Sequence, residues 1–277
     1  MLEAVFFGLD PRLLGLIVLI VLFLATEAGF RLGRPYAGQI ESSQRSQATT
    51  LQAAILGFLA LVLSFTYSGS YNRFDTRRQL VIQEANAIET TYLRAGTMPE
   101  KMRERTRALL RDYVITRTPT PMPKAVERAI AKAERLHEAL WKQAEQFSRS
   151  GADPARKTLF ISSLNETIDL HTSRVAAYLY RAPPALLFVL HVGAVIAVLF
   201  MGYVTGLDNR RFYIGLGAMV VLITILLTVI VDLENARMGF ITASQQPLLD
   251  VQENIGAVGP EGPPRGFQPG SRLPGTE

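Results

Sequence analysis

Residues 51–96 read LQAAILGFLALVLSFTYSGSYNRFDTRRQLVIQEANAIETTYLRAG, an apolar half followed by a polar half with no proline in either. Because proline breaks helices, its absence predicts one continuous helix of about 45 residues, roughly 65 Å long. Gly96 is expected to end this helix, since glycine is favoured directly after a last turn. A helix that starts among apolar residues and continues among polar ones indicates a protein that crosses a membrane.

Apolar residues are gathered in four blocks along the chain. They make up 48% of the 277 residues, and the mean hydropathy is +0.18, which is too apolar for an average soluble protein. A helix that crosses the hydrocarbon core needs about 20 mostly apolar residues, because lipid offers no partner to backbone N–H and C=O groups. The second block is short and alone could be a buried core helix. Together the blocks predict an all-α integral membrane protein with four transmembrane helices: Leu13–Phe30, Leu51–Tyr67, Leu186–Val204 and Phe212–Val231.

The first block could instead be a secretory signal peptide. Its leading segment carries Glu3 and Asp10 with only Arg12 to oppose them, and no small-residue cleavage site follows the apolar run cleanly. We therefore expect the first block to be retained as a transmembrane helix.

Positive charge is concentrated between the second and third blocks. About two thirds of the 29 Lys and Arg residues lie between residues 69 and 181. Positive residues resist translocation, so this loop is expected to be cytoplasmic. The chain is then expected to be a multi-pass protein of the cell (inner) membrane, and with four spans both of its termini lie in the cytoplasm. Because this topology explains where the positive residues lie, the net charge of +5 does not indicate a nucleic-acid partner, and none is expected.

The loop between the second and third spans has the pattern of a helical bundle. Thr97 is the expected N-cap of one helix, Asp153 of another, and a further helix is expected over 124–148. The predicted organisation is a first transmembrane helix and short loop (1–50), the long second helix (51–96), a cytoplasmic bundle (97–182), the third and fourth spans with an amphipathic segment (183–255), and a disordered tail (256–277). The tail is expected to be disordered because about half of it is Gly and Pro.

Motifs for catalysis, nucleotide binding and metal binding are absent from the sequence. The histidines His137, His171 and His191 fall on different predicted helices without the spacing of a metal site, and the chain has no cysteine. We therefore expect no enzyme activity and no cofactor.

The second span carries small and polar residues at seven-residue spacing. Such a stripe has two interpretations: small residues allow helices to approach closely, or the stripe lines a water-filled path. The candidate pore-lining residues are Gly57, Phe58, Leu61, Ser64, Phe65, Ser68 and Tyr71. Below them, Arg73, Arg77 and Arg78 would either attract anions to the mouth of a pore or contact anionic lipid heads.

Four stretches carry a resemblance to a known family: RRQLVIQEANAIETTYLRA (77–95), SSLNETIDLHTSRVAA (162–177), MGYVTGLDNRR (201–211) and VDLENARMGFITASQQPLLD (231–250). The chain resembles four-span bacterial membrane proteins described as bestrophin-like, from Leu51 to about Leu249.

The resemblance implies kinship with bestrophins, which are pentameric chloride channels whose second span lines the pore. It implies a homo-oligomer that conducts chloride or another small anion. It marks Asp232, Glu234 and Gly239 as a motif where the last span leaves the membrane. It also implies polar residues on facing bundle helices, which are Glu84, Asn86, Asn165, Asp169 and Arg174.

A second class of function fits the same features. The protein could be a non-conducting membrane scaffold or sensor whose bundle binds a partner protein or anionic lipid. In that case the long second helix would transmit a shift from the membrane to the cytoplasm.

Overall fold

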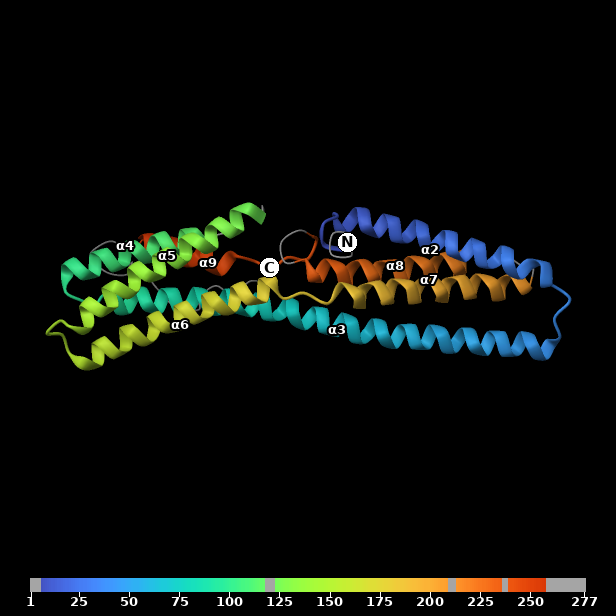
Figure 1. Cartoon of the computed structure of the whole chain (residues 1–277), viewed down its shortest axis with the longest axis horizontal. Helices are drawn as coiled ribbons and strands as arrows, with labels where there is room; N and C mark the ends of the chain where they lie inside the picture. The colour runs from blue at the N-terminus through green and yellow to red at the C-terminus, as the bar shows by residue number, and fades with distance from the viewer. Residues whose placement is uncertain (1–5, 118–122, 209–212, 236–238, 258–277) are drawn as a thin grey trace, which may run out of the picture. The chain divides into compact units, whose positions relative to one another are not determined.

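The computed structural model describes residues 6–117, 123–208, 213–235 and 239–257, and within these ranges it contains helices and no strand. The prediction of an all-α protein is confirmed. In chain order, the elements drawn in Figure 1 are α2 (Pro11–Gly33), a 3-10 turn η1 (Arg34–Tyr36), α3 (Ser42–Ala95), α4 (Glu100–Arg117), α5 (Pro123–Ser148), α6 (Pro154–Leu179), α7 (Pro184–Leu207), α8 (Tyr213–Glu234) and α9 (Gln246–Ala257).

The chain divides into two compact units. The membrane unit consists of Met1–Arg77 and Tyr178–Ala243, and the bundle unit consists of Arg78–Ala177 and Ser244–Glu277. Among the described residues, four helical stretches are long and apolar enough to cross a membrane, and they contain α2, α3, α7 and α8. The prediction of four candidate transmembrane helices is therefore confirmed.

The helix predicted from Leu51 begins earlier than expected. α3 starts at Ser42 and runs for 54 residues to Ala95, directly before Gly96 as predicted. The stretch before Leu51 contains neither proline nor glycine, so nothing stops the helix from extending. Arg45, in its first turn, binds the end of α7 through the Leu207 carbonyl at 2.9 Å and the Asp208 carboxylate at 2.7 Å.

In the membrane unit, α2 and α7 pack with their backbones in contact. A Cβ atom added at Gly29 would lie 1.9 Å from the Leu199 carbonyl oxygen, and one at Gly202 would lie 2.1 Å from that of Thr26. Gly33 and Gly206, four residues further along each helix, are equally crowded. Two glycines four residues apart on each helix form the small-xxx-small pattern of membrane helices. The sequence analysis missed this pattern, although it is readable in residues 29–33 and 202–206.

The apolar part of α3 is packed much less. Only 11% of its most apolar window is buried, against 39% of the window in the stretch that contains α7. Leu59 and Leu63 are the buried apolar residues that join α3 to the core of the membrane unit. One face of α3 thus contacts the unit, and most of its circumference does not.

The bundle unit has a core of its own. Tyr92, Tyr113, Phe147 and Phe160 are fully buried in it. α9 packs into this core through a stripe with the spacing of an amphipathic helix, namely Leu248, Val251 and Ile255.

The ends of the bundle helices test two predicted caps. Asp153 caps α6, because its carboxylate accepts the Ala155 N–H at 2.8 Å. The prediction that Thr97 caps α4 is wrong: α4 begins at Glu100, and the Thr97 hydroxyl donates to the Arg94 carbonyl at 2.8 Å. The Thr97 hydroxyl and the Thr97 N–H both donate to the Arg94 carbonyl near the end of α3. Of the predicted tail, Gly256 and Ala257 belong to α9, and 258–277 lie outside the described residues.

The glycine contacts predict a large effect of one methyl group. We expect Gly202→Ala to destabilise the detergent-solubilised protein by about 1–3 kcal/mol, because the added Cβ must push two backbones apart. The measurement is thermal unfolding of the full-length chain. Gly217→Ala on α8 is the matched control, since a Cβ there meets nothing within 4 Å. Equal effects of the two substitutions would contradict the close packing of α2 on α7.

Candidate functional site

The candidate pore-lining residues of α3 share one exposed face. At 100° per residue they fall within an arc of about 140° around the helix axis, and all seven are exposed. Phe58 and Phe65 are the most exposed of them, with 69% and 71% of their surfaces accessible. The spacing of Phe58, Leu61 and Phe65 puts these three side chains in one row.

The packed face of α3 lies directly opposite. Leu59, Leu63, Thr66, Ser70 and Arg77 are buried, and their arc is centred about 180° from that of the exposed residues. The Thr66 hydroxyl donates to the Val62 carbonyl of its own helix. α3 is therefore two-sided: one face packs on the membrane unit, and the other carries the candidate pore residues, of which Ser64 lies at the edge next to α8.

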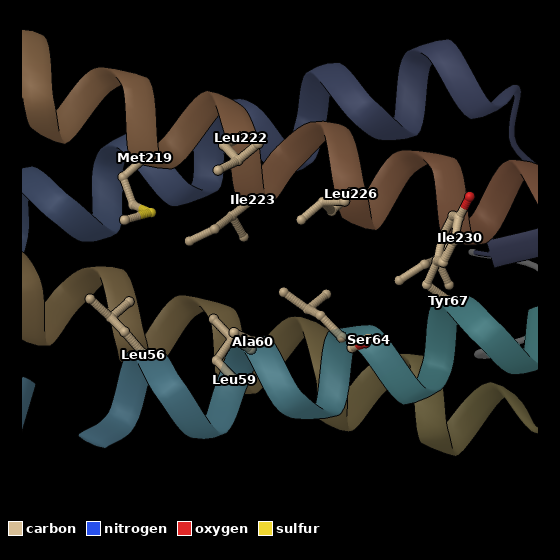
Figure 2. A pocket seen from close by; sticks show the side chains of 11 residues that line it. Leu56, Leu59, Ala60, Ser64, Tyr67, Met219, Leu222, Ile223, Leu226 and Ile230 are labelled. Carbon is tan, nitrogen blue, oxygen red and sulfur yellow. The ribbon is translucent and has the colours of Figure 1, made fainter. Parts of the chain in front are cut away.

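Beside the packed face, α3 and α8 border a groove with a volume of about 530 Å³. Figure 2 shows the two rows of side chains that point toward one another across it, Leu56, Ala60, Ser64 and Tyr67 from α3 and Met219, Leu222, Leu226 and Ile230 from α8. The lining is almost entirely hydrocarbon, with hydroxyl groups only on Ser64 and Tyr67.

The three arginines that follow the second span have different surroundings. Arg73 binds the Glu234 carboxylate with its Nε and Nη2 atoms at 2.9 and 2.5 Å, and Arg77 is buried and donates to the Leu233 carbonyl. Arg78 alone of the three is exposed, seven residues after Tyr71 and on the same face of α3. The sequence analysis treated them as one basic group, because adjacent charges look equivalent until their partners are known.

The exit motif consists of two carboxylates that hold backbone N–H groups. Asp232 is buried and accepts the N–H groups of Phe240 at 3.0 Å and Ile241 at 2.8 Å. Glu234 accepts the Ala182 N–H at 2.9 Å in addition to Arg73. Gly239 lies against Asp232, and a Cβ there would be 2.1 Å from its Oδ1 atom. The motif therefore ties the segment after α8 and the start of α7 to the end of α8.

Glu84 is the centre of a buried ionic network in the bundle unit. Its carboxylate accepts from Arg117 at 2.7 and 3.2 Å, from Arg174 at 2.5 Å and from the Tyr113 hydroxyl at 2.8 Å. Arg174 also donates to Gln245, next to α9. Burial alone would raise the pKa of Glu84, but the charges of the two arginines and their hydrogen bonds lower it to about 2.

The other polar residues expected on facing bundle helices lie outside this network. Asn86, Asn165 and Asp169 are exposed. Asn165 and Asp169 border a shallow polar hollow of about 440 Å³, together with Gln83, Ser162, Glu166, Leu170 and Ser173. The network instead recruits Arg117 and Tyr113 of α4, which the sequence analysis did not single out.

Two of the histidines meet inside the bundle. The rings of His137 on α5 and His171 on α6 are 4.7 Å apart and perpendicular, and Tyr113 packs on His137 at 4.9 Å. Both histidines are buried, at 8% and 4% exposed. Burial first, and then the charge of Arg117, lowers the pKa of each from 6.5 to about 4. Among the described residues, no group of three or more potential ligands is placed to hold a metal ion.

The sequence matches the Bestrophin-like domain family over residues 20–248, which is most of the chain. The chain belongs to this family. The recognition made from its motifs is thereby confirmed, and the match includes α3, α7, α8 and all of the bundle except most of α9.

Solved structures of bacterial bestrophin homologues from Klebsiella pneumoniae share the fold of this bestrophin-like chain. One single-substitution variant aligns with a TM-score of 0.61 over 85% of this chain and 99% of that chain, at 16% identity. A second variant aligns with a TM-score of 0.62 over 86% and 97%, also at 16% identity. No curated protein matches the chain. At this identity the structural likeness establishes the fold alone.

The buried network predicts that Glu84 cannot be neutralised without loss of stability. Glu84→Gln leaves two buried arginines without their counter-charge, so we expect a loss of about 3–5 kcal/mol in the bundle. Denaturant unfolding followed by the fluorescence of Trp141, the only tryptophan, measures it. Glu166→Gln on α6 makes the same chemical change at an exposed position and should lose less than about 0.5 kcal/mol. A similar loss in both variants would contradict the assignment.

The histidine pair predicts a pH dependence of bundle stability. In the unfolded bundle each histidine binds a proton near pH 6.5, but in the folded bundle only near pH 4. The two histidines therefore leave the free energy of unfolding of the bundle unchanged above about pH 6.5. They lower it as the pH falls toward 4, because the unfolded state binds more protons. Thermal unfolding of the full-length protein between pH 7.5 and 4.5, followed at Trp141, should show this slope.

The doubly substituted variant His137→Asn/His171→Asn should lose most of the slope and match the wild type in helix content at pH 7.5. His191→Asn, on α7 in the membrane unit, removes the remaining histidine and should retain the slope. An unchanged slope in the double variant would show that other groups titrate.

Proposed function

We propose that this bestrophin-like protein is an oligomeric anion channel, with the exposed face of α3 lining a pore between subunits. It lies in the cell membrane with both termini and the bundle unit in the cytoplasm. Chloride or a similar small anion is the permeant ion, as the kinship with bestrophins implies.

The observation that carries this proposal is the two-sided character of α3. A helix in lipid gains little from exposing serines and a tyrosine in a row, because hydrocarbon offers their hydroxyl groups no partner beyond the carbonyls of their own helix. Ser68 and Tyr71 are nevertheless on the face that the membrane unit leaves uncovered, and Ser64 lies at the edge of this face beside α8. Around a pore this face would meet water and its counterparts in neighbouring subunits. A single subunit contributes one such helix, so a closed pore requires several copies.

The aromatic row on this face is the proposed constriction. Phe58, Leu61 and Phe65 occupy successive turns, and rings of such side chains would form a narrow apolar girdle that dewets easily. Gly57 leaves space beside Phe58, since nothing lies within 4 Å of the position where its Cβ would be.

Arg78 is the proposed source of anion preference. It is exposed and follows Tyr71 on the same face of α3, whereas Arg73 and Arg77 are held by Glu234 and Leu233. A ring of Arg78 side chains would raise the local concentration of anions.

The first test is the detergent-corrected mass of the purified protein by light scattering, followed by chloride flux in liposomes. We expect a ring of several subunits that conducts chloride. A monomer contradicts the proposal, and a ring without flux would favour the non-conducting scaffold.

The second test concerns selectivity. Arg78→Glu should reduce the permeability ratio of chloride over sodium several-fold, because it reverses the charge of the ring. Arg135→Glu, at an exposed position of α5, makes the same charge change and should leave the ratio unaltered. If Arg78→Glu conducts with the wild-type ratio, Arg78 is not at the mouth of the pore.

A further inference from the structure

A second feature of the membrane unit is the groove between α3 and α8, which shares only Ser64 with the candidate pore-lining residues of α3. Its lining extends from Leu56 to Tyr67 on α3 and from Met219 to Ile230 on α8. Eleven residue steps correspond to about 16 Å along a helix. That is roughly half of the 30 Å hydrocarbon core of a bilayer, the depth of one leaflet. The groove therefore has the length and the chemistry of a single acyl chain (Figure 2).

A cluster of arginines contacts the end of α8, a few residues past the last residue of this helix that lines the groove. The guanidinium of Arg77 contacts the carbonyl of Leu233, three residues past Ile230, and Arg73 binds Glu234 one residue further on. Arg181 directly precedes Ala182, whose N–H binds Glu234, and its guanidinium lies 4.9 Å from the centre of the Phe7 ring. Even with Asp232 included, three arginines face two carboxylates, and Asp232 already holds two backbone N–H groups. The end of α8, just beyond the groove, thus carries an excess of positive charge.

Arg77 also has an unsatisfied donor. Its side chain is more than nine-tenths buried, and its Nη1 atom lacks a hydrogen-bond partner within the described part of the chain. A buried guanidinium N–H without an acceptor is costly, whereas a phosphate oxygen is the acceptor that arginine binds best. An anion bound near Arg77 would supply the acceptor that this donor lacks.

We propose that the membrane unit binds one anionic phospholipid per subunit, with an acyl chain in the groove between α3 and α8 and the phosphate at Arg73, Arg77 and Arg181. A second copy of the chain would fill the groove with a helix but would bring no phosphate. Free phosphate would satisfy Arg77 but leave the groove empty. The phospholipid satisfies both, and it makes contact on the packed side of α3, away from the exposed aromatic row.

The test uses the full-length protein in mild detergent with added phosphatidylglycerol, with phosphatidylcholine or with inorganic phosphate. We expect saturable binding of phosphatidylglycerol by native mass spectrometry, at least tenfold tighter than phosphatidylcholine, with a rise in thermal midpoint that saturates in parallel. Equal binding of the two lipids overturns the proposal. An equal rise in thermal midpoint with inorganic phosphate alone also overturns it.

Two variants separate the parts of the site. Arg181→Gln should weaken phosphatidylglycerol binding about tenfold, because a charge-assisted contact is lost while the ion pair of Arg73 with Glu234 remains. Ala60→Phe fills the groove and should abolish binding. Two substitutions are the matched controls. Arg34→Gln lies in η1, directly after the C-terminal end of α2, and Ala54→Phe lies on α3 outside the groove. Both variants should bind phosphatidylglycerol as the wild type does.

A measurement on the wild type makes the outcome independent of how the variants fold. Phosphatidylglycerol with a photoreactive diazirine in its acyl chain should cross-link to peptides containing residues 56–67 or 219–230. Cross-links elsewhere overturn the proposal, as does a change of oligomeric mass in Ala60→Phe with lipid binding intact, which would assign the groove to a second copy. The inference does not depend on conduction, because flux is not among its readouts.

Discussion

A bilayer core offers no hydrogen-bond partner to a peptide backbone, and that constraint shapes the membrane unit of this protein. Helices satisfy their own backbone groups along the apolar spans, but the N–H groups of the segments before α7 and after α8 need partners from elsewhere. Asp232 and Glu234 supply them by accepting the N–H groups of Phe240, Ile241 and Ala182. The two carboxylates at the end of α8 therefore hold the neighbouring backbone segments in defined positions.

The same constraint divides the helices by how they associate. Lipid and leucine are equally apolar, so membrane helices adhere through close backbone contact and not through hydrophobic burial. α2 and α7 achieve this with Gly29 and Gly202, whose missing side chains let one backbone lie against the next. α3 has no such contact, and Gly57 on its exposed face has open space around it. α2, α7 and α8 form a scaffold, and α3 keeps one face free for other partners.

Much of this architecture could be predicted from the sequence, because it depends on local patterns. Apolar block length predicted the four candidate spans, and the absence of proline predicted the continuous α3. The choice of partners could not be predicted in this way. Arg73 finds Glu234 and Glu84 finds Arg174 across 161 and 90 residues of sequence, and periodicity does not say which charge lies opposite which. For that reason Asn165 and Asp169 looked equivalent to Arg174 on α6, although they lie on its exposed side.

The ionic networks on α3 can fix the register of this helix without adding much to the stability of the fold. A buried ion pair gains little net stability over apolar packing, because the desolvation of its charges offsets their attraction. Its removal is nevertheless costly, so the arrangement enforces one register of the helices. Glu84 fixes α3 against α4 and α6 in the bundle unit, and Arg73 and Arg77 fix α3 against α8 in the membrane unit. With its rotation set within each unit by buried charges on one side, α3 can present Phe58, Phe65 and Arg78 on the other side without contacts of their own. The proposed pore-lining role of α3 requires this combination, since a face that opens onto water cannot be positioned by packing against it.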